Sequence, residues 1–241
     1  MIKTILCCAF LVFDVLFVTP FGLIAALLNL LGLRKAMEFF MLCIEVFWSR
    51  LLIRVVGCRV IVSGRENIPR NGGVCFFSNH CGLFDIVLLL AYSGRVTGFI
   101  AKRELAFIPV LNLWICMLGG LYIDRKNPRS ALKTISRGIE KIKNGSAMII
   151  FPEGHRSRGQ GLLPFRPGAL KLATQAEAVI VPVALTGTYE LFEKNYRVNT
   201  DNPLKITFCK PVNTIDIPPA DRKQALSDQI YTVIREELER N

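Results

Sequence analysis

Histidine is scarce in this sequence of 241 residues, which contains only two, His80 and His155. Histidine is the side chain whose ordinary pKa lies closest to neutral pH, and it is the most frequent general base in enzymes. Its scarcity therefore narrows the search for a general base to two positions.

The cysteines lack the spacing of metal-binding or redox pairs. Eight are present, and no two of them form a C-x-x-C pair. Most lie within apolar runs, where a free thiol behaves as a small hydrophobic side chain. This pattern predicts buried free thiols in a reducing compartment.

Acidic residues are too few to balance the basic ones. Thirty Lys and Arg against nineteen Asp and Glu give a formal net charge of +11. The chain lacks zinc-finger spacing, an RNP-type aromatic motif and a basic zipper, which argues against a nucleic-acid partner. Since 51% of the residues are hydrophobic and the mean hydropathy is +0.39, the composition favours an anionic membrane surface as the partner.

Charge is nearly missing from the first 33 residues, where only Lys3 and Asp14 are charged. The apolar run is long enough for a membrane-spanning helix, but Asp14 and the Thr-Pro-Phe-Gly sequence at 19–22 would interrupt it. Two half-length helices that enter one leaflet and return explain the pattern equally well. The length of the run and the lack of a small-x-small cleavage site argue against a signal peptide.

A second helical segment is expected at residues 36–56, and basic residues outnumber acidic ones between positions 34 and 70. An apolar segment followed by basic residues is typical of an interfacial anchor on anionic lipid. We therefore predict a membrane-associated helical segment at residues 1–57. The alternative is a pair of core helices with solvated basic ends.

Short apolar runs alternate with helical stretches from residue 58 onward. The expected strands are 59–63, 74–78, 96–101, 121–123, 147–151, 179–185 and 204–209. Apolar residues at helical spacing predict helices over two stretches, around Leu132, Ile135, Ile139 and Ile142 and around Leu226, Ile230, Val233, Ile234 and Leu238. This pattern predicts an α/β domain at residues 58–241, with a mostly parallel sheet flanked by helices.

The first candidate site follows the expected strand 74–78, which ends at Ser78 and is followed by Asn79 and His80. An apolar helix begins near Asp85. In a continuous helix His80 and Asp85 would lie about 140° out of alignment, so the chain must turn between them, and Gly82 favours such a turn. A histidine held by an aspartate through Nδ1 can take a proton from an alcohol with Nε2. On spacing alone, a structural histidine fits equally well.

Cys81 lies beside His80, which raises the possibility of a Cys–His nucleophile. Consecutive residues at a strand end usually point apart, and no second histidine is close in the sequence. The pattern therefore argues against a catalytic Cys81.

Basic groups follow three further expected strands. The loop after 147–151 carries Glu153, Arg156 and Arg158, and the arginine fork suits phosphate oxygens. Lys102 and Arg125 follow the strands 96–101 and 121–123. If these strand ends share one edge of the sheet, they form a positively charged pocket beside His80. For the loop after 147–151, the alternative is a solvated basic loop without a ligand.

Together these segments resemble the glycerolipid acyltransferase family, whose best-known members are the 1-acyl-sn-glycerol-3-phosphate acyltransferases. The family's N-H-x-x-x-x-D motif matches Asn79, His80 and Asp85, and its F-P-E-G-T-R-S motif resembles residues 151–157. An Arg-ending motif resembles 120–125, and a proline-centred motif resembles 181–184. The chain departs from the family where Gly82 replaces the common Ser and His155 replaces the usual Thr; we expect His155 to be a spectator.

The resemblance implies that His80 deprotonates the sn-2 hydroxyl of lysophosphatidic acid while Asp85 orients the imidazole, which yields phosphatidic acid for phospholipid biosynthesis. It also implies a substrate-binding set made of Lys102, Arg125, Glu153, Gly154, Arg156 and Ser157. The acyl group would come from acyl-CoA or acyl-carrier protein, without a metal or bound cofactor. The enzyme would lie on the cytoplasmic face of a membrane.

The motifs leave the acceptor open. Glycerol-3-phosphate, another lysophospholipid or an amino-acid lysolipid could replace lysophosphatidic acid. A membrane lipid hydrolase and a non-catalytic lipid-binding protein are alternatives from other functional classes.

Overall fold

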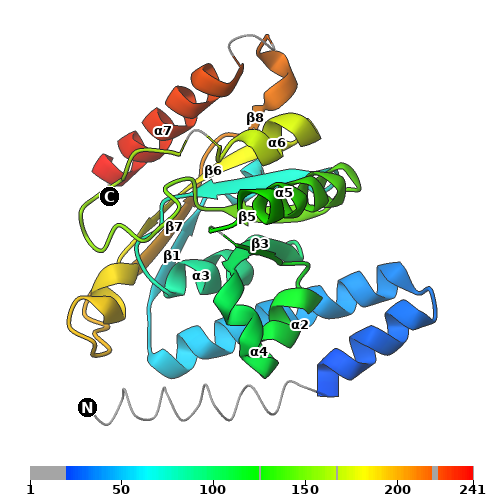
Figure 1. Cartoon of the computed structure of the whole chain (residues 1–241). Helices are drawn as coiled ribbons and strands as arrows, with labels where there is room; N and C mark the ends of the chain where they lie inside the picture. Colours follow the sequence, from blue (N-terminus) through cyan, green and yellow to red (C-terminus); the bar gives the residue numbers. More distant parts are fainter. Residues whose placement is uncertain (1–19, 125, 167, 219–221, 241) are drawn as a thin grey trace.

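The computed structural model describes residues 20–124, 126–166, 168–218 and 222–240, and it contains an eight-stranded sheet with helices on both faces (Figure 1). The strands are β1 (Val60–Ser63), β2 (Val74–Ser78), β3 (Thr97–Lys102), β4 (Leu121–Ile123), β5 (Ala147–Ile150), β6 (Val179–Thr186), β7 (Leu204–Phe208) and β8 (Val212–Asn213). The α-helices are α2 (Arg34–Val56), α3 (Phe84–Tyr92), α4 (Pro109–Met117), α5 (Pro128–Lys143), α6 (Lys171–Ala176) and α7 (Arg222–Arg240). Short helical turns are η1 (Arg65–Asn67), η2 (Arg103–Phe107), η3 (Tyr189–Glu193) and η4 (Thr214–Asp216).

The sheet is mostly parallel, as predicted. Its strand order is β1-β7-β6-β2-β5-β3-β4, and β8 pairs with β6. Only the pairings of β6 with β7 and β8 are antiparallel among the described strands. Because β6, β2, β5, β3 and β4 are successive parallel neighbours, their carboxyl ends lie at one edge of the sheet.

Both faces of the sheet are covered, as the fully apolar strands predicted. In β2 the side chains of Val74 and Phe76 join one core cluster, together with side chains of α2, α3 and α4. Cys75 and Phe77 point to the other face and join a second cluster with α5, α6 and α7. All four side chains are fully buried, so β2 lies at the centre of the domain.

The segment before the sheet consists of a helix over residues 20–30 and the longer α2. α2 contributes Met41, Ile53 and Val56 to the same core cluster as α3. None of the helices in the described part of the chain combines the length and apolarity that crossing a membrane requires. Residues 1–19 lie outside the described residues, so the choice between a span and two half-helices, like the domain boundary after residue 57, stays a prediction.

The predicted strands agree with the structure to within one residue at each end. α3 begins at Phe84, next to the predicted start at Asp85. The short β8 was not predicted, because two residues carry no alternating pattern. The sheet thus brings the predicted site loops to a common edge.

Candidate active site

Asn79 fixes the start of the loop that carries His80. Its Nδ2 donates to the carbonyl oxygen of Leu185 at 2.9 Å, and its Oδ1 accepts from the Leu185 amide at 2.8 Å. These two hydrogen bonds join the end of β2 to β6, and Asn79 is almost fully buried. The asparagine is therefore a structural clamp for the loop, which explains why an amide is needed there.

The next pair of residues forms a histidine–carboxylate contact. Nδ1 of His80 lies 2.7 Å from Oδ2 of Asp85, in the first turn of α3. The same oxygen accepts hydrogen bonds from the amides of Cys81 at 2.6 Å and Gly82 at 2.9 Å. The chain thus turns between His80 and Asp85 as predicted, and the carboxylate itself closes the turn.

The imidazole of His80 is held on one ring face as well. It stacks on the Phe151 ring with a centroid distance of 4.0 Å and an interplanar angle of 17°. The His80 side chain is 18% exposed, whereas the Asp85 side chain is fully buried. Nδ1 faces the buried carboxylate, and no hydrogen bond of the described residues uses Nε2, which leaves Nε2 for a substrate proton.

Gly82 is required by close packing rather than by its backbone angles. A Cβ atom at this position would lie 2.8 Å from the Thr188 carbonyl oxygen and 2.9 Å from Oε2 of Glu193. The predicted turn is present, but Gly82 has no positive φ, so its lack of a side chain is the feature that matters. A serine, which the resembled family commonly has at this position, would bring its Cβ against the Thr188 carbonyl oxygen and the Glu193 carboxylate.

Glu153 holds the backbone of the same loop. Its Oε1 accepts a hydrogen bond from the His80 amide at 2.6 Å, and its Oε2 accepts one from the Leu163 amide at 3.0 Å. Burial raises the pKa of Glu153, and these two amide hydrogen bonds act in the opposite direction. Both oxygens of Glu153 thus already accept a backbone hydrogen bond. The predicted contact of Glu153 with a substrate hydroxyl stays a prediction.

The peptide of His80 is held from its other side by Ser157. The Ser157 amide donates to the His80 carbonyl oxygen at 2.7 Å. Gly154 lies between Glu153 and Ser157, and its φ is 75°. A Cβ atom at this position would lie 2.5 Å from Nε of Arg166. Gly154 and Ser157, both predicted to bind substrate, therefore also shape the loop that supports His80.

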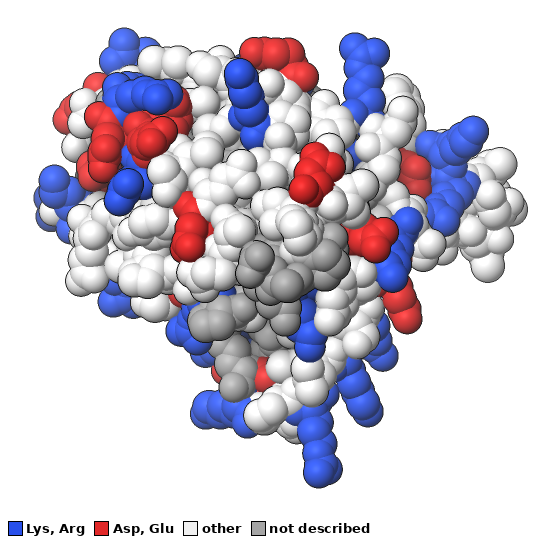
Figure 2. All heavy atoms as spheres, turned by 90° about the horizontal axis from the view of Figure 1, so that it is seen from above, with Lys and Arg blue, Asp and Glu red and all other residues white. Residues whose placement is uncertain are grey.

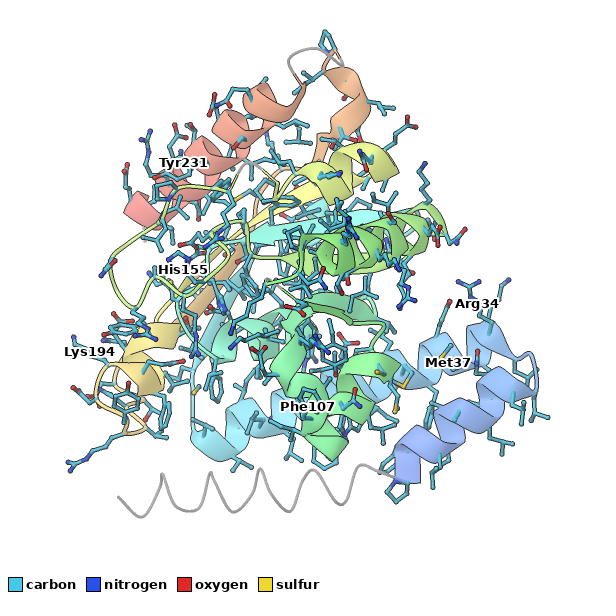
Figure 3. The ribbon with its side chains drawn as sticks, viewed as in Figure 1. Arg34, Met37, Phe107, His155, Lys194 and Tyr231 are labelled. Carbon is cyan, nitrogen blue, oxygen red and sulfur yellow. The ribbon has the colours of Figure 1, made fainter. Side chains whose placement is uncertain are left out.

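Arg156 is paired with a carboxylate that the sequence did not indicate. Its Nη1 lies 3.2 Å from Oε1 of Glu193, which also accepts a hydrogen bond from the Leu83 amide at 2.6 Å. The Arg156 side chain remains partly exposed, and the amide of the next residue, Ser157, holds the His80 carbonyl oxygen. His155, its neighbour, is exposed (Figure 3). Glu193 comes from η3, and no local sequence signal joins it to residues 83 and 156.

Of the two basic residues predicted at the ends of β3 and β4, the structure describes one, Lys102. Lys102 lies at the carboxyl end of β3, where its exposed ammonium pairs with Glu104 at 3.1 Å. Arg125 lies outside the described residues. The strands β2, β3, β4 and β5 do end at one edge, which confirms the condition under which a shared basic pocket was predicted.

Cys81 lies beside the pair but is poorly suited to act as a nucleophile. Burial raises the pKa of its thiol to about 12, and the Asp85 carboxylate adds to this effect. A nucleophilic cysteine needs the opposite environment, which stabilises the thiolate. The described residues include no group of three or more His, Cys, Asp or Glu side chains placed to hold a metal ion. The expected independence of metals and cofactors stays a prediction.

A model of the acyltransferase family matches residues 59–186, which make up just over half of the chain and include His80, Asp85 and residues 153–157. The chain belongs to the acyltransferase family. Among relatives of this acyltransferase, 1-acyl-sn-glycerol-3-phosphate acyltransferase of Cocos nucifera is 32% identical over 169 residues. The enzyme of the same name from Borreliella burgdorferi is 29% identical over 189 residues, which are 78% of this chain and 74% of that protein.

A solved structure extends the similarity to nearly the whole acyltransferase. The 1-acyl-sn-glycerophosphate (LPA) acyltransferase PlsC from Thermotoga maritima superposes with a TM-score of 0.86 and 27% identity, covering 99% of this chain and 94% of that one. The match to the Cocos nucifera protein covers 70% of this chain but only 54% of that protein. The family and fold are thus established, and the acceptor and donor of this acyltransferase are matters of proposal.

Proposed function

We propose that this protein transfers a fatty acyl group from an acyl thioester to the sn-2 hydroxyl of lysophosphatidic acid, and so makes phosphatidic acid. The observation that carries the proposal is the contact between His80 and the buried Asp85 within an acyltransferase domain. The relatives described above are named for this reaction, which supports the choice of acceptor.

The proposed step is a direct transfer with His80 as the general base. Nε2 of His80 takes the proton of the sn-2 hydroxyl as its oxygen attacks the thioester carbonyl, and Asp85 stabilises the imidazolium that forms. The C–S bond then breaks, and the imidazolium returns the proton to the departing thiolate. The donor is acyl-CoA or acyl-carrier protein, and no protein nucleophile is needed.

The phosphate of the acceptor would be bound by the basic groups at the same sheet edge. Arg156 is partly exposed in the loop after β5, and Lys102 ends β3, the parallel neighbour of β5. Arg125 is included among the phosphate-binding residues only because of the resemblance to the acyltransferase family. Because Glu193 already pairs with Arg156, it would orient the guanidinium before the phosphate arrives. In this arrangement Glu153 positions His80 and would contact the glycerol only by sharing one of its oxygens.

The protein would lie on the cytoplasmic face of a membrane, where lysolipid and thioester meet. Large apolar side chains are exposed along the first two helices, among them Leu30 at 83% and Phe39 at 70%. Phe107, also exposed, lies on the same side of the sheet as these helices in Figure 3. Exposed apolar side chains on this scale are typical of a surface that inserts into lipid.

Product analysis with a panel of acceptors tests this proposal. Detergent-solubilised protein is incubated with palmitoyl-CoA and either lysophosphatidic acid, glycerol-3-phosphate or lysophosphatidylcholine, and the lipids are identified by mass spectrometry. Conversion of lysophosphatidic acid to phosphatidic acid, with little acylation of the other two acceptors, supports the proposal. A larger yield of acylated product from another acceptor would assign that acceptor as the substrate. Free palmitate without any acylated lipid would indicate a hydrolase.

A further inference from the structure

A cavity of about 650 Å³ opens at the edge of the sheet opposite His80. Its lining comes from the chain just before β2, β3 and β5, from the first turns of α2 and from the end of α4. Five residues of β2 separate this edge from the His80 loop, or roughly 17 Å at about 3.3 Å per residue. Figure 3 shows Arg34 and Met37, which line the cavity, on the side of the molecule away from His155 and Lys194.

Positive charge predominates in this cavity. Its basic lining residues are Arg34, Lys35, Arg70, Arg95 and Lys141, and its acidic one is Glu38. Glu38 accepts a hydrogen bond from Arg34 at 3.0 Å, so its carboxylate is already shared. A concave site with several cations and one engaged carboxylate attracts anions.

Two of the cations are held in place by neutral groups. The Arg95 guanidinium donates to the carbonyl oxygens of Gly72 at 2.8 Å and Gly145 at 2.7 Å, and Lys141 donates to that of Gly119 at 2.9 Å. Burial lowers the pKa of both basic side chains, and neither forms a salt bridge within the described part of the chain. Carbonyl groups orient these charges without neutralising them, which leaves the cations pre-positioned for an anion.

The cavity also has an apolar side. Met37, Leu42, Val96, Met117 and Leu118 contribute to its lining, from α2, the start of β3 and the end of α4. Leu30 at the end of the first helix is exposed, as are Leu31 and Leu33 in the turn that precedes α2. Seen from above in Figure 2, the right-hand tip, where residues 20–30 meet α2, is formed by uncharged side chains with basic side chains beside them. The basic cavity is therefore continuous with an exposed apolar surface.

We propose that this cavity binds the phosphate head group of an anionic membrane phospholipid, as a second lipid site separate from the reacting groups. The phosphate would lie among Lys35, Arg70 and Lys141, and the upper part of the acyl chains would contact Met37 and Leu42. A free phosphate or a soluble nucleotide would leave the apolar side of the cavity uncovered, which is why we favour a lipid. The inference depends on the proposed membrane association and is independent of acyl transfer.

Vesicle binding tests this site with a matched pair of variants. Lys35→Gln with Arg70→Gln removes two exposed positive charges from the cavity, and Lys133→Gln with Arg137→Gln removes two from exposed positions of α5. Co-sedimentation is measured with phosphatidylcholine vesicles and with vesicles that also contain phosphatidylglycerol, an anionic lipid that is neither proposed substrate nor product. We expect the cavity variant to bind the anionic vesicles roughly tenfold or more weakly, the α5 variant to lose less than about threefold, and neutral vesicles to bind all forms alike.

Two results would overturn the proposal. Equal losses in the two variants would mean that diffuse charge, and no defined site, attracts the membrane. Saturable calorimetric binding of inorganic phosphate that disappears in the cavity variant would identify a site for free anions. The same sedimentation with His80→Ala is expected to match the wild type, so a failure of the acyl-transfer proposal would not affect this test.

Discussion

The backbone amide of His80 donates a hydrogen bond of 2.6 Å to the carboxylate of Glu153, so the proposed base is held by its main chain as well as by its side chain. The other Glu153 oxygen accepts from the Leu163 amide, 3.0 Å away. One buried carboxylate thus joins the loop after β2 to the loop after β5. This arrangement gives Glu153 a positioning role that can be separated from substrate contact.

Glu153→Gln should lower both stability and turnover. The glutamine amide group would face a backbone N–H that needs an acceptor, which costs about 1–3 kcal/mol for a buried donor. We expect the melting temperature and kcat to fall together, as measured by scanning fluorimetry and thioester turnover. An unchanged melting temperature with only a higher KM for lysophosphatidic acid would assign Glu153 to substrate binding instead.

Asp85→Asn should remove most of the turnover while substrate binding persists. An asparagine can still accept from the Cys81 and Gly82 amides with its carbonyl oxygen, but it is neutral and cannot stabilise the imidazolium. By analogy with other histidine–carboxylate pairs, we expect kcat to fall roughly a thousandfold or more. The KM for lysophosphatidic acid should change only a few-fold. Wild-type turnover in this variant would exclude Asp85 from the mechanism.

The pair formed by Arg156 and Glu193 predicts a split between binding and chemistry. Arg156→Ala should mainly raise the KM for lysophosphatidic acid, because it removes a phosphate contact. Glu193→Gln keeps a hydrogen-bond acceptor but weakens the ion pair, so a smaller rise in the same KM is expected. Steady-state kinetics with each substrate varied in turn provides the measurement. An effect confined to the KM of the thioester donor would contradict the assignment of Arg156.

Stability should depend on pH through Glu45, which lies outside the active site. Burial raises the pKa of Glu45 well above its ordinary value of 4.5, although its Oε1 accepts a hydrogen bond from Oγ1 of Thr97 at 3.1 Å. The folded protein then holds a proton that the unfolded chain has released. The free energy of unfolding therefore falls as the pH rises from 4.5 through the raised pKa of the folded state.

Glu45→Gln should reduce this dependence, because it keeps a neutral group of similar shape in the same place. The melting temperatures of the two proteins, compared from about pH 5 to pH 8, should diverge in favour of the variant as the pH increases. Parallel curves would show that the pKa of Glu45 is not raised in the folded protein.

The strands and the His80–Asp85 pair could be predicted because their signals are local. Apolar runs bounded by polar residues define β2 and β5, and the motif from Asn79 to Asp85 spans only seven residues. The supports of the site could not be predicted in the same way. Asn79 bonds to Leu185, 106 residues away, and Glu193 bonds to the Leu83 amide, 110 residues away. Such contacts depend on which strands become neighbours, and β6 lies beside β2 although β3, β4 and β5 come between them in the sequence.

The most direct test of the account is thiol release from palmitoyl-CoA by solubilised protein, with and without lysophosphatidic acid. The wild type, His80→Ala and the matched variant His155→Ala are compared. We predict release that requires the acceptor in the wild type and in His155→Ala, and its loss in His80→Ala. Acceptor-dependent release that persists in His80→Ala would contradict the central claim that His80 is the general base.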